Sequence, residues 1–293
     1  MHPATQLDSS TPRGTGLSLF QPYTDDQIAA ATKRARRSII EMTHAAASGH
    51  PGGSLSAVEI LAGLYLTGVL RHDPENPQWP DRDRFILSKA HAVPVLYAYL
   101  AECGYMPFEE ITTFRAINSR LQGHSKAGSV PGVEMSGGSL GQGLSYSIGQ
   151  CLAARLDQRD YRVYCLLGDG ELDEGQVWEA AMAASHYGLD NLIAIVDRNG
   201  VQNDGHIIDI MRQEPLADKW RAFGWQVQEI DGHDQNAVTK ALRSAQEATG
   251  CPSVIIAKTV KGKGVSFMEN TAVWHGRGPN AEERAKALAE IGE

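Results

Sequence analysis

The sequence predicts an α/β fold in which a doubly wound, mostly parallel sheet is covered by helices on both faces. Two observations carry this prediction. Residues 161–197 are typical of strand, helix and strand in succession, so the two strands should run parallel with a right-handed crossover. Downstream, strands and helices continue to alternate, which is the pattern of a doubly wound sheet. The hydrophobic content of 42% in 293 residues is sufficient for a core of that kind.

The first half of the chain is predicted to be mainly helical. Residues 1–23 are rich in Ser, Thr, Pro and Gly, so we expect a flexible arm there, followed by one domain over 24–293. Thr24 and Gln27 form a capping box, which begins a helix that runs to about residue 47. Further helices are expected at 56–69, 94–103 and 108–117, with a short strand at 84–88.

The second half carries the alternation of strands and helices. Residues 123–143 contain too much Gly and Ser to be regular throughout, and a helix follows at 142–156. The clearest strand is 161–167, with the sequence YRVYCLL. The remaining elements are helices at 174–187 and 235–249 and strands at 192–197, 225–230 and 253–259.

Charge and cysteine content argue against several classes of protein. The net charge of −8 disfavours a nucleic-acid coat or a polybasic membrane surface, and no apolar run approaches the ~18 residues of a membrane span. The start lacks the apolar core of a secretory signal. Wide spacing of the cysteines disfavours a disulfide framework or a metal-thiolate site and indicates a cytoplasmic protein. They are Cys103, Cys151, Cys165 and Cys251.

Two oxygen-bearing side chains follow neighbouring strands of the predicted sheet. Asp169 comes directly after strand 161–167, and Asn199 follows strand 192–197. Ligands bind outside the carboxyl ends of parallel strands, and a carboxylate with an amide oxygen suits Mg²⁺ or Ca²⁺ completed by phosphate and water. Glycines beside Asp169 and the positive end of the helix at 174–187 favour an anion. The pattern predicts a metal-bound diphosphate; the alternative is two ordinary turns.

The same segment resembles a known family. Gly168-Asp169-Gly170, then 28 residues, then Asn199 is the motif of thiamine-diphosphate enzymes, and the residues around it are similar to transketolase in particular. The resemblance implies the transfer of a two-carbon ketol unit from a ketose to an aldose. It extends through six ordered blocks: SGHPG at 48–52, SKAH at 88–91, GH at 123–124, GSLGQG at 138–143, KGKG at 261–264 and WHG at 274–276.

The resemblance implies a role for each matching position around the cofactor. Mg²⁺, with Ca²⁺ or Mn²⁺ as substitutes, would be held by Asp169, Asn199 and the backbone carbonyl of Val201. Gly170 would contact the diphosphate of thiamine diphosphate. Three further side chains would lie near that diphosphate: His91, Lys261 and His275.

The remaining implied roles concern the cofactor's ring, a second copy of the chain and the sugar. Glu174 would belong to an acidic network that couples two cofactor sites across a dimer. His50 and His124 would face the sugar, with His275 as a third catalytic histidine. The aminopyrimidine and its neighbourhood would be met by Gly138, Ser139 and Leu140.

The histidines suit this chemistry for an independent reason. Polarising a ketose carbonyl and moving hydroxyl protons near neutral pH require groups that titrate there. His50, His91, His124 and His275 each lie beside a glycine, a proline or a strand end. The others are expected to have no part in the chemistry: His2, His44, His72, His186, His206 and His233.

The resemblance covers only the first domain of a single-chain transketolase. A second domain normally carries the glutamate that activates the aminopyrimidine, and a third follows it. The chain therefore resembles the N-terminal half of a split transketolase. The resemblance implies a partner chain with the C-terminal domains and a homodimer core, giving an α2β2 assembly. Ser125-Lys126 departs from the family's Pro-Glu after His124, which bears on the choice of sugar.

Three alternatives are considered beside this interpretation. Another thiamine-diphosphate enzyme, such as a deoxyxylulose-phosphate synthase or the α subunit of a 2-oxo-acid dehydrogenase, is disfavoured by the four histidines and the SGHPG block. A split transketolase for an unusual sugar, such as a sulfosugar or a branched pentose, is the second alternative, and no residue of the sequence speaks against it. A non-catalytic binding subunit ranks lower, because Asp169 and the histidines are all present.

Overall fold

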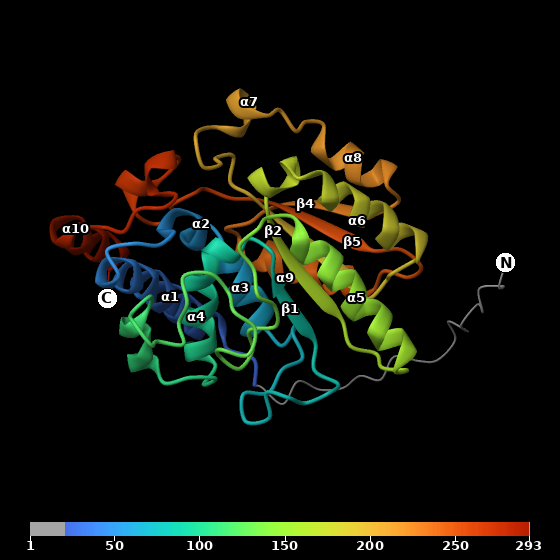
Figure 1. The fold of residues 1–293 in the computed structure, drawn as a ribbon, viewed down its shortest axis with the longest axis horizontal. Helices are drawn as coiled ribbons and strands as arrows, with labels where there is room; N and C mark the ends of the chain where they lie inside the picture. Colours follow the sequence, from blue (N-terminus) through green and yellow to red (C-terminus); the bar gives the residue numbers. More distant parts are fainter. Residues whose placement is uncertain (1–20, 293) are drawn as a thin grey trace.

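A five-stranded parallel sheet forms the centre of residues 21–292, the part of the chain that the computed structural model describes (Figure 1). The strand order is β1-β2-β3-β5-β4, and each pair of neighbours is parallel, so the predicted α/β fold is confirmed. The strands are β1 (Arg84–Leu87), β2 (Val163–Gly168), β3 (Leu192–Arg198), β4 (Gln226–Asp231) and β5 (Ser253–Lys258).

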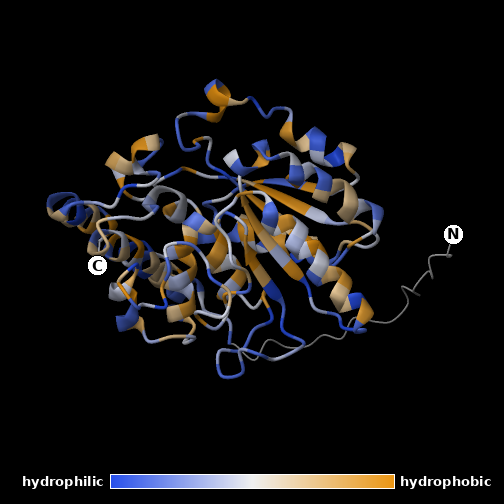
Figure 2. Ribbon diagram, viewed as in Figure 1, coloured by the Kyte–Doolittle hydropathy of each residue, from blue (hydrophilic) through white to orange (hydrophobic). Residues whose placement is uncertain are grey.

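Four strands of the sheet are mainly buried and apolar, whereas the edge strand β4 has only exposed and partly buried residues (Figure 2). Successive residues of a strand point to opposite faces, and β3 shows the consequence. Ile193 and Ile195 belong to one hydrophobic cluster, whereas Ala194 and Val196 belong to another. The sheet therefore separates two cores, each of which is closed by its own group of helices.

One core lies under α1 (Asp25–Ala45), α3 (Val58–Tyr65), α4 (Val93–Glu102) and α9 (Gln235–Gln246). Thr24 and Gln27 make the predicted capping box: the Thr24 hydroxyl accepts from the Gln27 N–H, and the Gln27 side chain accepts from the Thr24 N–H. α10 (Ala281–Ile291) packs against α1 from outside.

The other core lies under α5 (Gln142–Leu156), α6 (Gly175–His186) and α8 (Leu216–Ala222). α5 packs against both β2 and α6, and Figure 1 shows the two helices side by side across the sheet. The short helices α2 (Pro51–Leu55) and α7 (Ile207–Ile210) lie in segments around the strand ends. No helix within residues 21–292 is long and apolar enough to cross a membrane.

The predicted arm, residues 1–23, lies outside the described residues except for its last three. There, the Tyr23 N–H donates to the Leu66 carbonyl at 2.8 Å.

Two predicted helices are wrong in extent. The helix expected at 56–69 is confirmed only over α3. The separate short helix α2 precedes it, because Pro51 starts a helix one residue after His50 and the backbone leaves helical geometry at Ala57.

The helix expected at 108–117 is a 3₁₀ segment that ends at Thr113. Phe114 has extended ψ, and Arg115 adopts a left-handed φ of 59°, which no helix can continue. The Arg115 N–H instead donates to the Leu121 carbonyl at 2.9 Å. This bond closes a loop that leads into residues 123–141, which are irregular as predicted.

Candidate active site

The carboxyl ends of β2 and β3 bring Asp169 and Asn199 together. Gly168 is in register with Asp197, so the residues that leave the two strands are neighbours. One oxygen of the Asp169 carboxylate accepts from the Gly200 N–H at 2.6 Å, and the other accepts from the Gly170 N–H at 2.9 Å. Both Asp169 and Asn199 are less than a tenth exposed. The geometry expected from the sheet topology is therefore present.

A cavity of about 290 Å³ opens at these strand ends. Its lining includes every site residue that the sequence predicted except Ser139 and Glu174. Both of these are exposed. Glu174 caps the start of α6, and its Cβ lies against Gly141, where an added Cβ would approach it to 2.8 Å. Glu174 therefore lies beside the start of α5 and does not line the cavity of its own chain.

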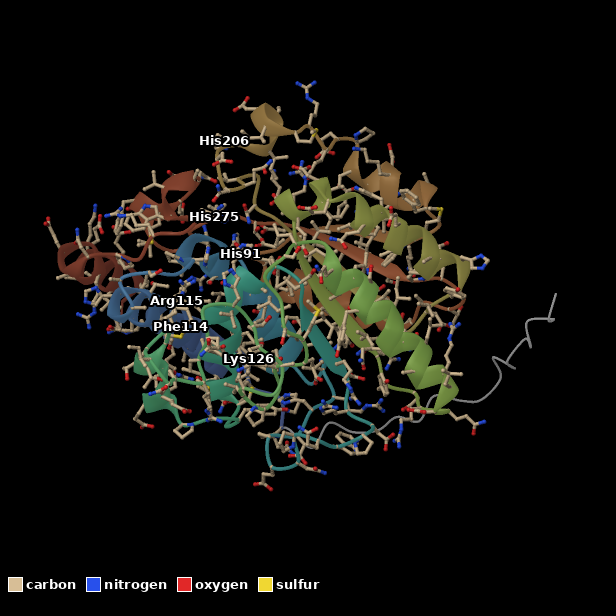
Figure 3. The ribbon with its side chains drawn as sticks, viewed as in Figure 1. His91, Phe114, Arg115, Lys126, His206 and His275 are labelled. Carbon is tan, nitrogen blue, oxygen red and sulfur yellow. The ribbon has the colours of Figure 1, made fainter. Side chains whose placement is uncertain are left out.

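Four histidines surround one side of the cavity. The His50 ring lies 5.2 Å from the ring of His91, 5.4 Å from that of His124 and 5.5 Å from that of His275, measured between centroids. The rings of His91 and His275 stack at 5.1 Å (Figure 3). The remaining described histidines lie elsewhere: His72, for example, is held by the hydroxyl of Tyr105 and the carbonyl of Tyr65.

The histidines of the cavity are neutral near pH 7. Burial, followed by the charges of neighbouring groups, lowers the pKa of His50 to about 4 and that of His275 to about 3. The same causes hold the pKa of His91 well below its usual value and lower that of His124. A neutral imidazole has one donor and one acceptor nitrogen, so each ring can form hydrogen bonds, but the expectation that these histidines titrate near neutral pH is wrong for His50 and His275.

Lys261 and Asp169 contribute opposite charges to the same cavity. The Lys261 ammonium donates to the Val201 carbonyl at 2.9 Å and lies 2.8 Å from Nδ1 of His275. Burial and the charge of Lys89 lower its pKa to about 8. Burial and the nearby Asp197 raise the pKa of Asp169 to about 6. A cation bound at Asp169 would stabilise the ionised carboxylate.

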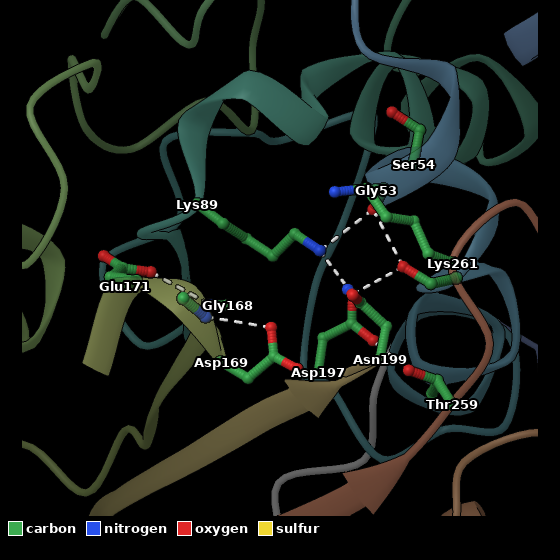
Figure 4. Close-up of polar contacts among 12 residues, drawn as sticks. Gly53, Ser54, Lys89, Gly168, Asp169, Glu171, Asp197, Asn199, Thr259 and Lys261 are labelled. Carbon is green, nitrogen blue, oxygen red and sulfur yellow. Dashed lines mark hydrogen bonds and ion pairs between the residues drawn. The ribbon is translucent and has the colours of Figure 1, made fainter. Parts of the chain in front are cut away.

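Several buried polar residues around the cavity were not predicted from the sequence, and two of them, Lys89 and Glu171, line it (Figure 4). Lys89 and Asp197 form an ion pair, and the Lys89 ammonium also donates to the Gly53 carbonyl at 2.9 Å. Glu171 accepts from the N–H of Gly141 at 2.8 Å and from that of Gly168 at 2.9 Å. Glu171 therefore joins the start of α5 to the end of β2. Lys89 lies in the SKAH block and Glu171 follows the GDG motif, but neither motif indicates which groups these side chains contact.

The cavity fits thiamine diphosphate with a hard metal ion. The side chains of Asp169 and Asn199 and the Val201 carbonyl each offer an oxygen atom, the kind of ligand that Mg²⁺ and Ca²⁺ prefer, and the Val201 carbonyl also accepts from the Lys261 ammonium at 2.9 Å. Among the described residues no group of three or more His, Cys, Asp or Glu could hold a metal ion by itself. The donor set therefore suits an ion that takes its other ligands from a diphosphate and water. At Gly53 an added Cβ would lie 3.4 Å from Nε2 of His91, so this glycine keeps the space before His91 open.

Comparison with known protein families gives one match, to the thiamine diphosphate-binding domain of transketolase, over residues 27–292. The chain belongs to the transketolase family. Its fold is also that of transketolase: the crystal structure of transketolase from Campylobacter jejuni superimposes with a TM-score of 0.87 at 34% identity. That match covers 92% of this chain but 43% of the Campylobacter chain.

Within the transketolase family, two kinds of relative differ in how much of their length is matched. A 6-deoxy-6-sulfo-D-fructose transketolase subunit of Clostridium sp. (strain MSTE9) is 47% identical over 83% of this chain and 88% of its own. An apulose-4-phosphate transketolase subunit of Phocaeicola vulgatus is 41% identical over 89% and 92%. Human transketolase is 44% identical, but only 38% of its length is matched. The chain therefore corresponds to separate subunits of similar length and to the first part of longer transketolases.

Proposed function

We propose that this chain is the thiamine diphosphate-binding subunit of a two-chain transketolase that transfers a two-carbon ketol unit from a ketose to an aldose. The observation that carries the proposal is the cavity at the ends of β2 and β3, where four neutral histidines face an oxygen-donor set. Residues 24–293 would form the domain that binds the cofactor. The relatives of similar length, which are named as transketolase subunits, support the same function.

The proposed roles at the cofactor follow from the donors in the cavity. Asp169, Asn199 and the Val201 carbonyl would hold Mg²⁺, with Ca²⁺ or Mn²⁺ able to replace it. When bound, thiamine diphosphate supplies the nucleophilic carbon that carries the ketol unit. The Lys261 ammonium would neutralise charge on the diphosphate, close to Gly170. Gly138, Ser139 and Leu140 would meet the aminopyrimidine, and His91 would lie near the diphosphate.

The proposed roles at the sugar belong to three histidines. His50 has a buried Nδ1 without a hydrogen-bond partner, so it is free to bind a hydroxyl of the sugar. Its ring lies next to those of His124 and His275, and all three residues line the same cavity. Because all three are neutral near pH 7, they can bind hydroxyl groups of the sugar without adding positive charge to the cavity.

We also propose that two copies of the chain form the core of an α2β2 assembly in the cytoplasm. The outer face of α5 carries the small residues Ser145 and Gly149 and the side chain of Leu156, which is 83% exposed. On α6, Met182 is 57% exposed. An exposed apolar face beside small residues suits a closely packed helix from a second copy. Glu174, at the start of α6, would then lie between the two cofactor sites.

The test is turnover by the chain with and without its partner. No acidic residue of this chain is assigned to activate the aminopyrimidine, so the purified chain alone should show negligible ketol transfer. A second chain with the complementary domains should restore transfer, with saturable dependence on its concentration. The control is the same mixture with Asp169→Asn, which should stay inactive. Transfer by the chain alone would refute the two-chain proposal, and inactivity with every complementary chain would refute the transketolase proposal.

A further inference from the structure

The Lys261 ammonium reaches the cavity from a turn that follows β5, and the backbone of this turn is held on both sides of Lys261. On the near side, the Val260 N–H donates to Nε2 of His233 at 2.8 Å. On the far side, the Lys263 carbonyl accepts from Nε of Arg36 at 3.2 Å. Side chains from two other parts of the chain therefore fix the backbone before and after Lys261.

A single carboxylate, that of Glu59 on α3, is bonded to both of these side chains. One of its oxygens lies 2.9 Å from Nδ1 of His233, and the other accepts from the Arg36 guanidinium at 2.6 Å. The side chains of Glu59, Arg36 and His233 are 11%, 12% and 14% exposed. Burial alone would raise the pKa of Glu59, but the hydrogen bond from His233 and the charge of Arg36 hold the pKa below its usual value. Glu59 is therefore an ionised group enclosed between two donors.

The hydrogen bonds of His233 determine which of its ring nitrogens carries the proton. A backbone N–H can only donate, so Nε2, which faces the Val260 N–H, is unprotonated. The proton of the neutral ring then lies on Nδ1 and is donated to the Glu59 carboxylate. The backbone N–H of His233 donates to the Asp231 carboxylate at 2.9 Å, which ties the histidine to the end of β4. The ring thus links the turn after β5 to α3 in one fixed orientation.

We propose that Glu59 is a positioning residue for the diphosphate site, acting through His233 and Arg36 to hold Lys261 where its ammonium meets a diphosphate. The inference rests on the proposed function, which assigns that ammonium to the diphosphate of the cofactor. Glu59, His233 and Arg36 do not line the cavity, so they act only through the backbone beside Lys261. A charge-assisted hydrogen bond depends on distance and angle, and a turn that moves would carry the ammonium out of reach.

The first experiment measures the binding of inorganic pyrophosphate with Mg²⁺ to the full chain by calorimetry. His233→Leu removes both ring nitrogens, and it should weaken the affinity by about 10-fold, the loss of one charge-assisted hydrogen bond. His233→Gln can still accept from the Val260 N–H and should restore most of the affinity. Glu59→Gln turns one of its two oxygens into a donor that faces another donor, so it should weaken the affinity as His233→Leu does.

The control is another buried histidine that is bonded through both ring nitrogens. His72 is held by the Tyr105 hydroxyl and the Tyr65 carbonyl, and it follows Arg71, whose carbonyl accepts from the N–H of Asp83 just before β1. It therefore lies at the opposite end of the strand from the cavity. His72→Leu should lower the melting temperature of the chain and leave its affinity for pyrophosphate unchanged. Equal losses of affinity in His72→Leu and His233→Leu would reduce the effect to general destabilisation and overturn the proposal.

A cycle of double variants tests whether His233 acts through Lys261. Lys261→Met removes the ammonium itself and should weaken pyrophosphate binding on its own. In that background His233→Leu should cause no further loss, because the group that it positions is already absent. Additive losses of affinity would show that His233 does not act through Lys261, and they would overturn the proposal. Normal affinity in His233→Leu with Lys261 present would do the same.

Turnover by the two-chain enzyme separates this proposal from the proposed function. His233→Leu should raise the concentration of thiamine diphosphate that gives half-maximal transfer and leave KM for the ketose unchanged. Active transfer with no effect of His233→Leu on pyrophosphate or thiamine diphosphate refutes the positioning role and leaves the transketolase function standing. A loss of pyrophosphate affinity that depends on Lys261, in a chain that transfers nothing with any partner, refutes the function and leaves the positioning role standing. A wild-type chain that binds no pyrophosphate would overturn both.

Discussion

Lys89 and Asp197 form an ion pair in the interior of the candidate site, although 108 residues separate them in the chain. Their side chains are 1% and 0% exposed. The Asp197 carboxylate also accepts from the Ser56 hydroxyl at 2.6 Å. Burial alone would raise the pKa of Asp197, but Lys89 and the hydrogen bond from Ser56 hold the pKa below its usual value. Asn199 donates to the same carboxylate at 3.3 Å, so the ion pair also orients a proposed metal ligand.

The first prediction is that removing one partner of this pair costs far more stability than removing an exposed one. Lys89→Met leaves the buried Asp197 carboxylate uncompensated, and we expect the free energy of unfolding to fall by about 3–5 kcal/mol. The control is Arg159→Met, which breaks an exposed pair with Asp81 and should cost less than about 1 kcal/mol. Urea unfolding followed by circular dichroism measures both. Equal losses in the two variants would contradict the prediction.

The second prediction concerns the metal site. Asp169→Asn keeps the shape of the side chain but removes the only charged ligand, so calorimetric binding of thiamine diphosphate with Mg²⁺ should be lost. Chelation of the metal should give the same loss in the wild type, and Asn199→Ala should weaken binding. Asp204→Asn, an exposed position in the next loop, makes the same charge change and should bind normally. Unchanged affinity in Asp169→Asn would show that the metal lies elsewhere.

The sequence predicts most of the sheet because its signals are local. Leu192 to Val196 is a continuous apolar run, and a strand buried on both faces requires such a run. The positions of Asp169 and Asn199 then follow from parallel topology alone, since the carboxyl ends of neighbouring strands share one edge. The four histidines of the cavity gather near that same edge, although the contacts between their rings could not be predicted from the sequence.

The parts that the sequence did not predict depend on contacts between distant segments. The ends of helix 108–117 were wrong because Arg115 leaves helical geometry to bond with Leu121 and to lie against Gly123, and no local propensity contains that information. Lys89 is visible in the SKAH block, but its partner in the interior belongs to β3. Glu174 and Ser139 are exposed and do not line the cavity, which their positions in the sequence did not indicate.

The third prediction separates the histidines by their effects on turnover and on cofactor binding. His124 lines the cavity and is proposed to face the sugar, so His124→Ala should lower kcat/KM by about 10²–10⁴-fold and leave cofactor affinity nearly unchanged. His91, which lies beside Gly53 at the diphosphate side, should affect both quantities. His186→Ala, on the exposed end of α6, is the control. A His124→Ala enzyme with normal kcat/KM for every ketose would remove His124 from the site.

The fourth prediction is acid destabilisation by the neutral histidines. His50 and His275 have pKa values of about 4 and about 3 in the folded chain, against about 6.5 when unfolded. Between pH 6.5 and 4, His50 and His275 therefore bind more protons in the unfolded chain than in the folded one. Their contribution to the free energy of unfolding falls as the pH is lowered. The double variant His50→Gln/His275→Gln should lose stability less steeply over this range in urea unfolding. Asp169, whose pKa is raised to about 6, acts in the opposite direction but equally in both proteins.

The last prediction concerns the outer face of α5. Gly149 lies in the middle of this helix, where glycine costs about 1 kcal/mol relative to alanine, yet an added Cβ would meet nothing within 4 Å in the single chain. Its small size is therefore not required by the chain itself, and we attribute it to the close approach of a second copy. Gly149→Arg should leave the chain folded and convert the homodimer to a monomer, as measured by light scattering of this chain alone with cofactor present. Thr249→Arg, exposed beyond α9 on the other face of the sheet, should remain dimeric. A wild type that is monomeric under these conditions would overturn the homodimer core, and a dimeric Gly149→Arg would place its interface on another surface.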